Sequence, residues 1–391
     1  MTNYVQLLEE TLDYSRDRDY VGYDKHDGMS SHIRRRFPGN NKWVNIAFQE
    51  TIKRAPINLR RLFLVQQRPN PKGLSLFAIA NINAHEITNR GQYRNEAIDL
   101  CNRVLSHRPK EYSGFCLPHN HALQTLKNQI SAGATGIVQT SYGVRALLMA
   151  AEWDEEFVSE AKSAASYIRN DLDPETIGEG IRVKYKPEDS GDFYTLNANA
   201  LAARLLLDLY CHTGSEEYEE FATDVLRYVA SRQFPNGGWM YRDPPSASHV
   251  SMDNYHNGFI IESFLRYQEV VSADAFTEIV DDALKFYRTV LYNEDGAPSW
   301  DEESTYPRDV HAAAQGVVTF THAGDLEFAR RIIDWTVENL YAGDGQFYYQ
   351  KRRWYTKRFT LMRWCQAWMA YAISEHLRCV ENDYYPLTQS S

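Results

Sequence analysis

One string of polar residues, 253–257, opens an otherwise apolar segment and is the densest group of chemically useful side chains in the chain. Tyr255 and His256 can both exchange protons, and a histidine does so near neutral pH because its ordinary pKa is about 6.5. Asp253 is suited to capping a helix N-terminus. Capping accounts for one of the five residues, so we expect Tyr255 or His256 to contact a substrate, with Asn257 beside them.

A second string repeats this pattern about one structural unit later. Asp309 and His311 open the apolar segment, Arg308 precedes them and Gln315 follows one helical turn later. A single Asp before a helix is most simply a cap, but two such strings exceed what capping requires. We expect His256 and His311 to face each other across one site, where either can serve as acid or base.

A third group adds positive charge and aromatic rings. Arg363 offers a planar fork for a carboxylate or phosphate, and the basic stretch 351–358 precedes it. Further residues are expected to line the site and contact the substrate: Trp239, Tyr241, Trp354, Tyr355, Trp364 and Gln366. The simpler interpretation of residues 351–358 is a basic loop exposed to solvent. Trp354 and Tyr355 lie among the basic residues, however, and they favour a segment that lines the substrate-binding site.

Several kinds of active site lack their sequence signatures here. The chain has no E-x-x-H or H-x-x-x-H pair, so we expect no metal centre. It has neither glycine-rich nucleotide motif and no G-x-S-x-G elbow, so we expect no nucleotide cofactor and no serine triad. The five cysteines are odd in number and lack C-x-x-C spacing, which favours reduced thiols.

The elements that must position these residues form a repeat of about 57 residues. Each unit has an apolar helix, a short turn, an amphipathic helix and a glycine turn followed by aromatic residues. The first helix of each unit is apolar on most faces and the second carries charge on one face, which predicts an inner and an outer ring. The inner helices begin near Gly73, Gln139, Leu196, Asp253, Asp309 and Met362.

The sixth inner helix, predicted over 362–377, has too little chain after it to form its own outer partner. That partner must come from the N-terminal region, either 4–16 or 43–53, and it would close the array into a ring. The sequence therefore predicts an all-α fold, an (α/α)6 toroid of helical hairpins with short extended segments, with an open solenoid as the alternative. We expect one domain overall, with residues 1–70 as an N-terminal extension packed on a toroid of residues 71–391.

The net charge, the apolar runs and the aromatic content of the chain narrow the classes of molecule that it is expected to bind. The formal net charge of −10 argues against nucleic acid. No apolar run approaches about 18 residues and no signal-like segment starts the chain, so we expect no integral membrane segment and a cytoplasmic protein, either free or peripheral to a membrane. Aromatic residues make up 13% of the chain and many fall in loops. Their faces stack on pyranose rings, which favours a sugar ligand.

Several strings resemble the AglQ-type and VpsJ-type proteins of N-glycan and polysaccharide gene clusters. They are N-P-K-G-L at 70–74, D-N-Y-H-N-G at 253–258, D-V-H-A-A-A-Q at 309–315 and M-R-W-C-Q-A-W at 362–368. The resemblance spans nearly the whole chain. It implies a six-hairpin glycosidase-like fold and an isomerase-like action on hexuronic acids in lipid-linked or exported glycans. Glycosyltransferases of the same pathway would then be partners.

The chemistry that this resemblance suggests is epimerisation at C5 of a uronic acid. One group removes the proton beside the carboxylate and another returns a proton from the opposite face. Tyr255 or His256 on one side and His311 or Tyr355 on the other are the expected pair. Arg363 or Arg308 would hold the carboxylate and stabilise the enolate-like charge.

Two other classes of function stay open on the sequence. A glycoside hydrolase needs two carboxylates about 5 to 9.5 Å apart, and Asp253 and Asp309 open neighbouring inner helices; a polysaccharide lyase would share the C5 step. The third class is a non-catalytic protein that only binds an oligosaccharide or glycan at its aromatic mouth.

Overall fold

The inner ring consists of helices that are buried on nearly every face. The structure, a computed structural model, describes residues 3–36, 41–126 and 129–384 of the chain. Within these residues, each inner helix packs against the next, and the last packs against the first. The inner helices are α4 (Pro71–Thr88), α6 (Ile137–Met149), α8 (Leu196–Thr213), α10 (Asn254–Val270), α12 (Val310–His322) and α14 (Trp368–Tyr384).

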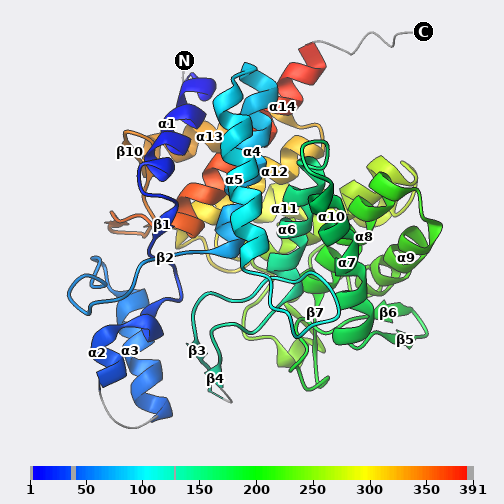
Figure 1. The fold of residues 1–391 in the computed structure, drawn as a ribbon, viewed down its shortest axis with the longest axis horizontal. Coiled ribbons are helices and arrows are strands. Elements are labelled where there is room, and N and C mark those ends of the chain that lie inside the picture. The colour runs from blue at the N-terminus through cyan, green and yellow to red at the C-terminus, as the bar shows by residue number, and fades with distance from the viewer. Residues whose placement is uncertain (1–2, 37–40, 127–128, 385–391) are drawn as a thin grey trace.

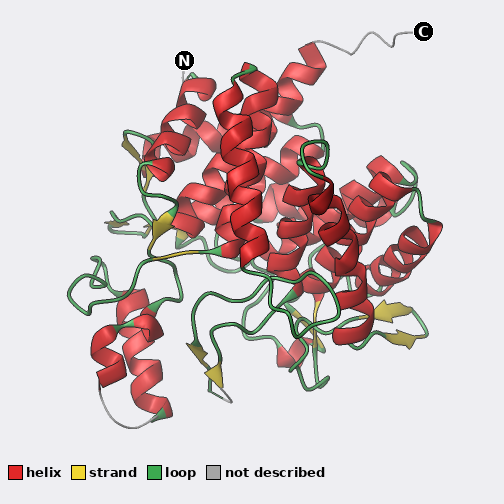
Figure 2. Ribbon diagram, in the orientation of Figure 1, coloured by secondary structure: helices red, strands yellow, loops and turns green. Residues whose placement is uncertain are grey.

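The outer helices lie antiparallel to the inner ones and are charged toward solvent. Each packs on its inner partner to make a hairpin, as Figures 1 and 2 show. The described outer helices are α1 (Tyr4–Arg16), α5 (Gly91–Ser106), α7 (Glu155–Asp171), α9 (Glu216–Ala230), α11 (Thr277–Val290) and α13 (Leu326–Leu340). This arrangement is the predicted (α/α)6 toroid, and the prediction is confirmed.

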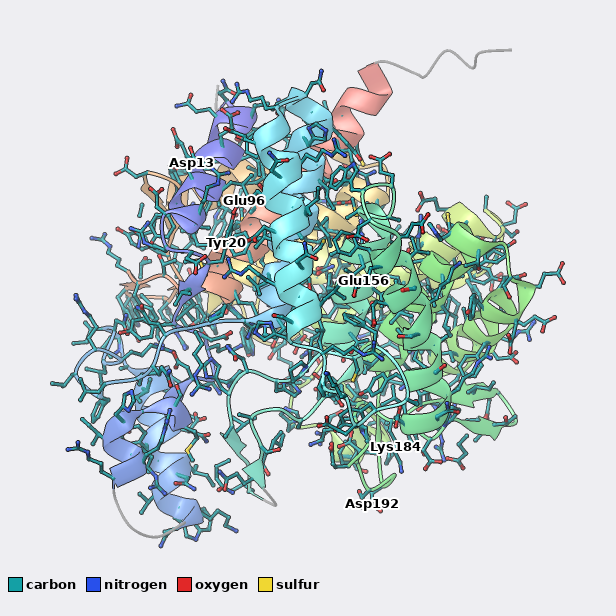
Figure 3. All side chains as sticks on the ribbon, viewed as in Figure 1. Asp13, Tyr20, Glu96, Glu156, Lys184 and Asp192 are labelled. Atoms are coloured by element: carbon teal, nitrogen blue, oxygen red, sulfur yellow. The ribbon has the colours of Figure 1, made fainter. Side chains whose placement is uncertain are left out.

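Helix α1 closes the ring. It packs against α14, although more than 350 residues separate the two helices along the chain. Leu8 and Leu12 of α1 are buried, and the Tyr341 hydroxyl donates to Glu10 Oε2 at 2.5 Å. On the other side, the Tyr20 hydroxyl donates to Glu96 Oε1 of α5 at 2.7 Å (Figure 3). Of the two predicted partners for the sixth inner helix, the structure therefore has residues 4–16.

Short strands and loops cover the end of the ring where the inner helices begin, which we call the mouth. A π-helical turn, Met362–Ala367, precedes α14 there. Strand pairs connect the loops: β1 (Val21–Gly22) with β2 (Arg68–Pro69), β7 (Tyr194–Thr195) with β8 (Arg242–Asp243), and β12 (Gln350–Lys351) with both β9 (Arg308–Asp309) and β13 (Thr356–Lys357). The remaining described pairs are β3 (Leu123–Gln124) with β4 (Gln129–Ile130), β5 (Glu175–Ile177) with β6 (Gly180–Arg182), and β10 (Tyr341–Gly343) with β11 (Gln346–Phe347).

A small helical arm projects from the mouth end of the ring. It consists of η1 (Gly28–Ser30), α2 (His32–Arg36), α3 (Lys42–Arg54) and the loop that leads to β2. Figure 1 shows it standing away from the hairpins, next to the β3–β4 hairpin. Gln49 of α3 donates to the Gln124 carbonyl at 3.0 Å, which fixes the arm to that hairpin. The second predicted partner helix, 43–53, thus belongs to the arm.

Because α1 is the outer partner that completes the ring, its buried face should be essential for stability. We expect Leu12→Ala to lower the free energy of unfolding by about 2–5 kcal/mol, since it removes a fully buried side chain. Urea unfolding followed by circular dichroism measures the change. Gln6→Ala, an exposed change on the same helix, should alter it by less than about 0.5 kcal/mol. Equal effects of the two changes would contradict this role for α1.

Candidate active site at the mouth of the ring

Five aromatic rings gather where α10, α12 and α14 begin. The ring centroid of Tyr255 lies 4.3 Å from that of His256 and 4.6 Å from that of His311, so Tyr255 contacts both histidines. The His311 centroid is 4.4 Å from Trp364 and 4.2 Å from Trp368. The structure therefore brings together Tyr255, His256, His311 and Trp364 from the three strings that the sequence singled out.

His256 is held by the cap of its own helix. Asp253 accepts the His256 backbone N–H at 3.0 Å through Oδ1, and its Oδ2 lies 2.6 Å from His256 Nδ1. A carboxylate beside Nδ1 favours the proton on that nitrogen, which leaves Nε2 as the acceptor. Tyr241 also packs on this ring, with the centroids 4.5 Å apart. His256 is thus oriented as a base whose Nε2 remains available.

His311 is a buried, neutral imidazole. Its side chain is 2% exposed, and neither ring nitrogen has a hydrogen-bond partner among the described residues. Burial and then the nearby amines of Lys72 and Lys25 lower its pKa well below the usual value. The Tyr255 hydroxyl has the opposite shift, because burial followed by the charges of Asp253 and Asp309 raises its pKa well above its usual value. At neutral pH the site therefore holds a neutral base beside a protonated phenol.

Lys25 brings an ammonium group into this aromatic cluster. Its side chain is 7% exposed, and Nζ lies 3.7 Å from the ring centroid of Trp364 and 5.5 Å from that of Tyr255. Within the described part of the chain, no carboxylate lies within ion-pair distance of Nζ. Burial lowers the pKa of Lys25 to about 8, against the opposing effect of Asp309. Cation–π contacts with Trp364 and Tyr255, together with the charges of Asp309 and Asp253, stabilise the ammonium group.

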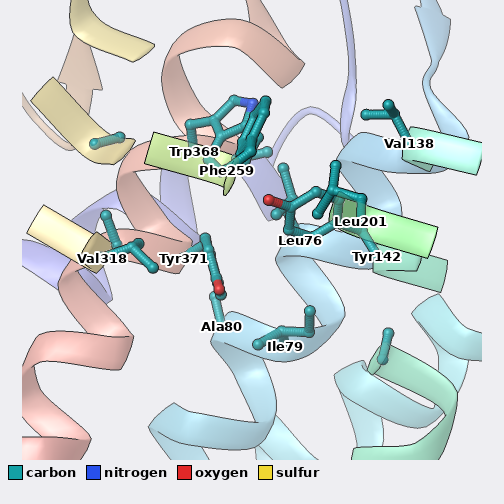
Figure 4. Close-up of a cluster of buried hydrophobic side chains, with 14 of the residues drawn as sticks. Leu76, Ile79, Ala80, Val138, Tyr142, Leu201, Phe259, Val318, Trp368 and Tyr371 are labelled. Atoms are coloured by element: carbon teal, nitrogen blue, oxygen red, sulfur yellow. The ribbon is translucent and has the colours of Figure 1, made fainter. Parts of the chain in front are cut away.

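Lys72, the second residue of α4, is a second buried amine. Its side chain is 8% exposed, and Nζ lies 4.7 Å from the centroid of Tyr142, 5.0 Å from Phe259 and 4.8 Å from Trp368. Figure 4 shows Phe259 against Trp368, with Tyr142 in the same buried cluster. Burial, and then Arg363, lower the pKa of Lys72 well below its usual value. No ion pair to Lys72 is present in the described residues.

Unpaired polar atoms surround the two amines. The Tyr142 hydroxyl, the Trp368 Nε1 group and both His311 nitrogens are buried and have no hydrogen-bond partner in the described residues. Buried polar groups in proteins are normally satisfied, so a cluster of unpaired ones at one place indicates a site for a polar ligand. Lys25, whose pKa of about 8 leaves it mostly charged at pH 7, gives that site a positive charge.

Arg363 has a different role from the one expected. Its Nε donates to Asp24 Oδ2 at 2.7 Å and its Nη2 to the other oxygen, and Asn70 adds a third bond to Asp24 at 2.9 Å. Burial alone would raise the pKa of Asp24, but the Arg363 guanidinium holds it well below the usual range. Arg363 is thus neutralised by Asp24, and it fixes the segment that carries Lys25.

The carboxylates of Asp253 and Asp309 are both fully engaged. Asp309 caps α12 through the His311 N–H at 2.9 Å, and it accepts Trp364 Nε1 at 2.8 Å and Gln350 Nε2 at 2.6 Å. Both residues are no more than 1% exposed. The simple interpretation of each as an N-cap is therefore correct, and their further bonds orient His256 and Trp364.

Several of the expected site residues hold the surrounding loops instead. Asn257 bonds the backbone of Trp239 at 2.8 and 3.1 Å, and the Trp239 indole donates to the Val229 carbonyl at 2.9 Å. Gln366 accepts the Phe347 N–H at 2.8 Å. These polar groups fix the returning segments to the inner helices and are not directed at the cluster.

The other expected residues lie deeper or farther out. Gln315 donates to Glu262 at 3.1 Å, in a buried layer of charged residues below the aromatic cluster where Arg204 and Arg145 pair with Glu262. Arg308 lies over Tyr306 and Trp335, on the outer side of its helix start. Trp354 is 83% exposed and Tyr355 45% exposed, on the turn between β12 and β13.

The described residues contain no group of His, Cys, Asp and Glu side chains arranged to hold a metal ion. Among them, no helix is both long and apolar enough to cross a membrane.

Comparison with known proteins shows the fold and leaves the family open. No protein-family model matches the sequence, and no curated protein matches it either. The structure is similar to that of cellobiose 2-epimerase from Bacillus thermoamylovorans, with a TM-score of 0.64, 14% identity and coverage of 79% of this chain and 87% of that one. The resemblance to the AglQ-type and VpsJ-type proteins therefore stays a prediction.

Two hydrolases have the same fold. A family 76 α-mannanase from Bacteroides thetaiotaomicron gives a TM-score of 0.62 at 12% identity, over 81% of this chain and 88% of that one. Unsaturated glucuronyl hydrolase from Bacillus sp. GL1 gives a TM-score of 0.62 at 13% identity, over 96% of this chain and 95% of that one. At this level of identity, the similarity establishes the six-hairpin glycosidase-like fold.

An unpaired buried amine should lower stability, and Lys25 allows a direct test. The pKa of Lys25 is about 8 in the folded state and 10.5 in the unfolded state, so the unfolded state binds the proton more tightly. The buried charge therefore lowers the free energy of unfolding by its full amount below pH 8, and this loss of stability fades as the pH rises toward 10.5. We expect Lys25→Met to raise the free energy of unfolding by about 1–3 kcal/mol at pH 7 and by less at pH 9.5, measured in urea. Lys162→Met, an exposed control, should change it by less than about 0.5 kcal/mol. Destabilisation by Lys25→Met at pH 7 would contradict the unpaired state of the amine.

Proposed function

We propose that this protein is a sugar epimerase or isomerase that acts on a hexuronic acid residue by removing a proton at C5. The observation that carries the proposal is the cluster of His256, Tyr255 and His311 beside two buried amines that lack carboxylate partners. The substrate would be an oligosaccharide or a lipid-linked glycan, in a pathway of glycan or polysaccharide assembly.

The first requirement of this reaction is a pair of groups that exchange protons with C5. Both imidazoles contact the Tyr255 ring, with their centroids 4.3 and 4.6 Å from it. His311 is neutral at pH 7 because burial lowers its pKa, so it can accept the C5 proton without first losing one. The Tyr255 hydroxyl stays protonated because burial raises its pKa, so it can supply a proton to the other face, and His256 Nε2, the acceptor nitrogen left by the Asp253 bond, is a second base beside it.

The second requirement is positive charge where the intermediate becomes negative. Removal of the C5 proton places charge on the carboxylate, which then has enolate character. A fixed cation in a site that excludes water stabilises such charge strongly. Lys25 supplies it, Lys72 adds a buried amine that can bond the carboxylate, and the aromatic rings around them would stack on the sugar.

Glycoside hydrolysis is supported less well by this geometry. A hydrolase needs one protonated and one ionised carboxyl group that can reach the glycosidic bond. Asp253 and Asp309 are buried, and each accepts at least two hydrogen bonds. Neither is free to donate a proton to a leaving group.

The structural neighbours support an enzyme that acts on sugars. One of them is a cellobiose 2-epimerase and another is an unsaturated glucuronyl hydrolase. For this chain we propose epimerisation as the reaction and a uronic acid residue as the substrate.

Proton NMR in deuterated water tests the proposed reaction. The purified protein is incubated with glucuronate-containing oligosaccharides while the C5 proton and the anomeric signals are followed. Loss of the C5 signal with the glycosidic bonds intact is the expected result. New reducing ends would indicate a hydrolase, an unsaturated product absorbing in the near ultraviolet would indicate a lyase, and binding without any change would indicate a glycan-binding protein. Each of these three outcomes contradicts the proposal.

Substitutions at the two imidazoles should separate catalysis from folding. We expect His256→Asn and His311→Asn each to lower the rate of C5 exchange by about 10²–10⁴-fold, because each removes one acid–base group. His212→Asn, at the exposed end of α8, is the matched control and should leave the rate unchanged. A full rate in both active-site variants, with unchanged circular dichroism, would rule out this assignment.

A further inference from the structure

The charge of the chain is distributed very unevenly. Residues 28–67, which make up the arm, contain eight Lys and Arg and a single acidic residue, Glu50, whereas the whole chain contains 42 Lys and Arg and 52 Asp and Glu. The arm therefore has a formal charge of +7 in a protein of net charge −10. A positive arm on an acidic ring makes the molecule strongly polar.

Most of this positive charge faces solvent. Only Arg34 and Arg60 are buried, and Arg60 pairs with Asp27 at 2.9 Å. Arg35, Arg36, Arg54 and Arg61 are exposed, and Lys42 and Lys53 are half-buried. Glu50 contacts Arg54 at 2.7 Å and Lys53 at 3.4 Å, so one acid offsets part of the charge. The outward surface of the arm is thus cationic.

Large apolar side chains are exposed among these cations. The exposed fraction is 64% for Trp43, 66% for Ile57, 70% for Leu62 and 56% for Leu64, and Val44 is 50% exposed. These side chains are not part of the hydrophobic core of the protein. They lie at the start of α3 and in the loop after it, and each stretch also carries exposed or half-buried basic residues.

Contacts within the arm bring these residues together. Phe63 packs on Phe48 of α3 with the ring centroids 5.1 Å apart, which places the loop of Leu62 and Leu64 against that helix. The Lys42 ammonium donates to the Leu126 carbonyl at 3.0 Å, and Leu126, on the β3–β4 hairpin, is itself 65% exposed. The arm and this hairpin therefore present apolar tips surrounded by basic side chains.

We propose that the arm and the β3–β4 hairpin form a docking surface for a membrane that contains anionic lipids. Basic side chains are attracted to acidic headgroups, while single Trp and Leu side chains on projecting loops enter the interface between headgroups and acyl chains. The acidic ring is repelled by the same surface, so the protein approaches arm first. The apolar residues are spread over separate tips between arginines, a distribution that suits a lipid surface better than a protein partner.

The location of the arm gives docking a consequence for the site. The segment with Asp24 and Lys25 leads from β1 into the arm, and the Lys357 ammonium donates to the Lys53 carbonyl at 2.8 Å. The arm thus stands beside the mouth, at the end where the inner helices begin (Figure 1). If the proposed function holds, a glycan anchored in the membrane reaches the mouth of a docked molecule. The docking surface itself does not depend on that function.

Co-sedimentation with lipid vesicles tests the surface. The full-length protein is mixed with vesicles of phosphatidylcholine alone, or of phosphatidylcholine with 25% phosphatidylglycerol (about that fraction suffices for an anionic surface). We expect binding to the anionic vesicles and little to the neutral ones, with at least a tenfold loss of affinity between about 0.05 and 0.5 M salt.

Two variants and one control identify the residues involved. We expect the double change Leu62→Asp and Leu64→Asp to weaken binding to anionic vesicles at least tenfold, and Arg35→Glu with Arg36→Glu to do the same. Val290→Asp, which replaces an apolar residue that is 40% exposed on α11, should leave binding unchanged. Circular dichroism and C5 exchange on a soluble oligosaccharide should be unaffected in all three, so that loss of docking is distinguished from loss of folding or activity.

Three outcomes would overturn the docking surface. They are no binding to anionic vesicles at low salt, equal binding by the variants and the wild-type protein, and a concentration-dependent dimer in light scattering that the arm variants abolish while vesicle binding persists.

Discussion

The structure depends on two lysine amino groups that are buried without a carboxylate beside them. Removing a charge from water is strongly unfavourable unless other groups replace the lost hydration. Here the faces of Trp364, Tyr142 and Trp368 replace part of it, as cation–π partners of Lys25 and Lys72. The inner helices also begin at this end, and their N-termini carry partial positive charge. Together with the charge of Lys25, these helix N-termini favour the binding of an anion.

The closed ring is what makes this arrangement possible. The cluster combines residues of α4, α6, α10, α12 and the segment that begins α14, and it exists because these helix starts meet at one end of the ring within the described chain. Asp253 and Asp309 serve twice, since each caps a helix and also orients an aromatic or imidazole ring. Closure by α1 fixes the last inner helix, and with it the π-helical turn that carries Arg363 and Trp364.

The repeat and the helix starts could be predicted from the sequence because apolar periodicity and turn residues are local signals. The strings around His256 and His311 could be placed in one mouth for the same reason. Lys25 could not be found in this way: it lies in an irregular segment, and its partners Tyr255 and Trp364 are hundreds of residues away. The sequence indicates Lys72 only weakly, as a single lysine at the start of an apolar helix. Arg363 was expected to bind substrate because the sequence does not show that Asp24 already neutralises it.

The most direct test of the account is calorimetric titration of the protein at pH 7 with a glucuronate-containing disaccharide and with the corresponding neutral glucose disaccharide. If the unpaired amines at the mouth serve to bind an anionic sugar, the uronate should bind at least tenfold more tightly, a difference of about 1.4 kcal/mol. Equal affinities, or tighter binding of the neutral sugar, would contradict the central claim.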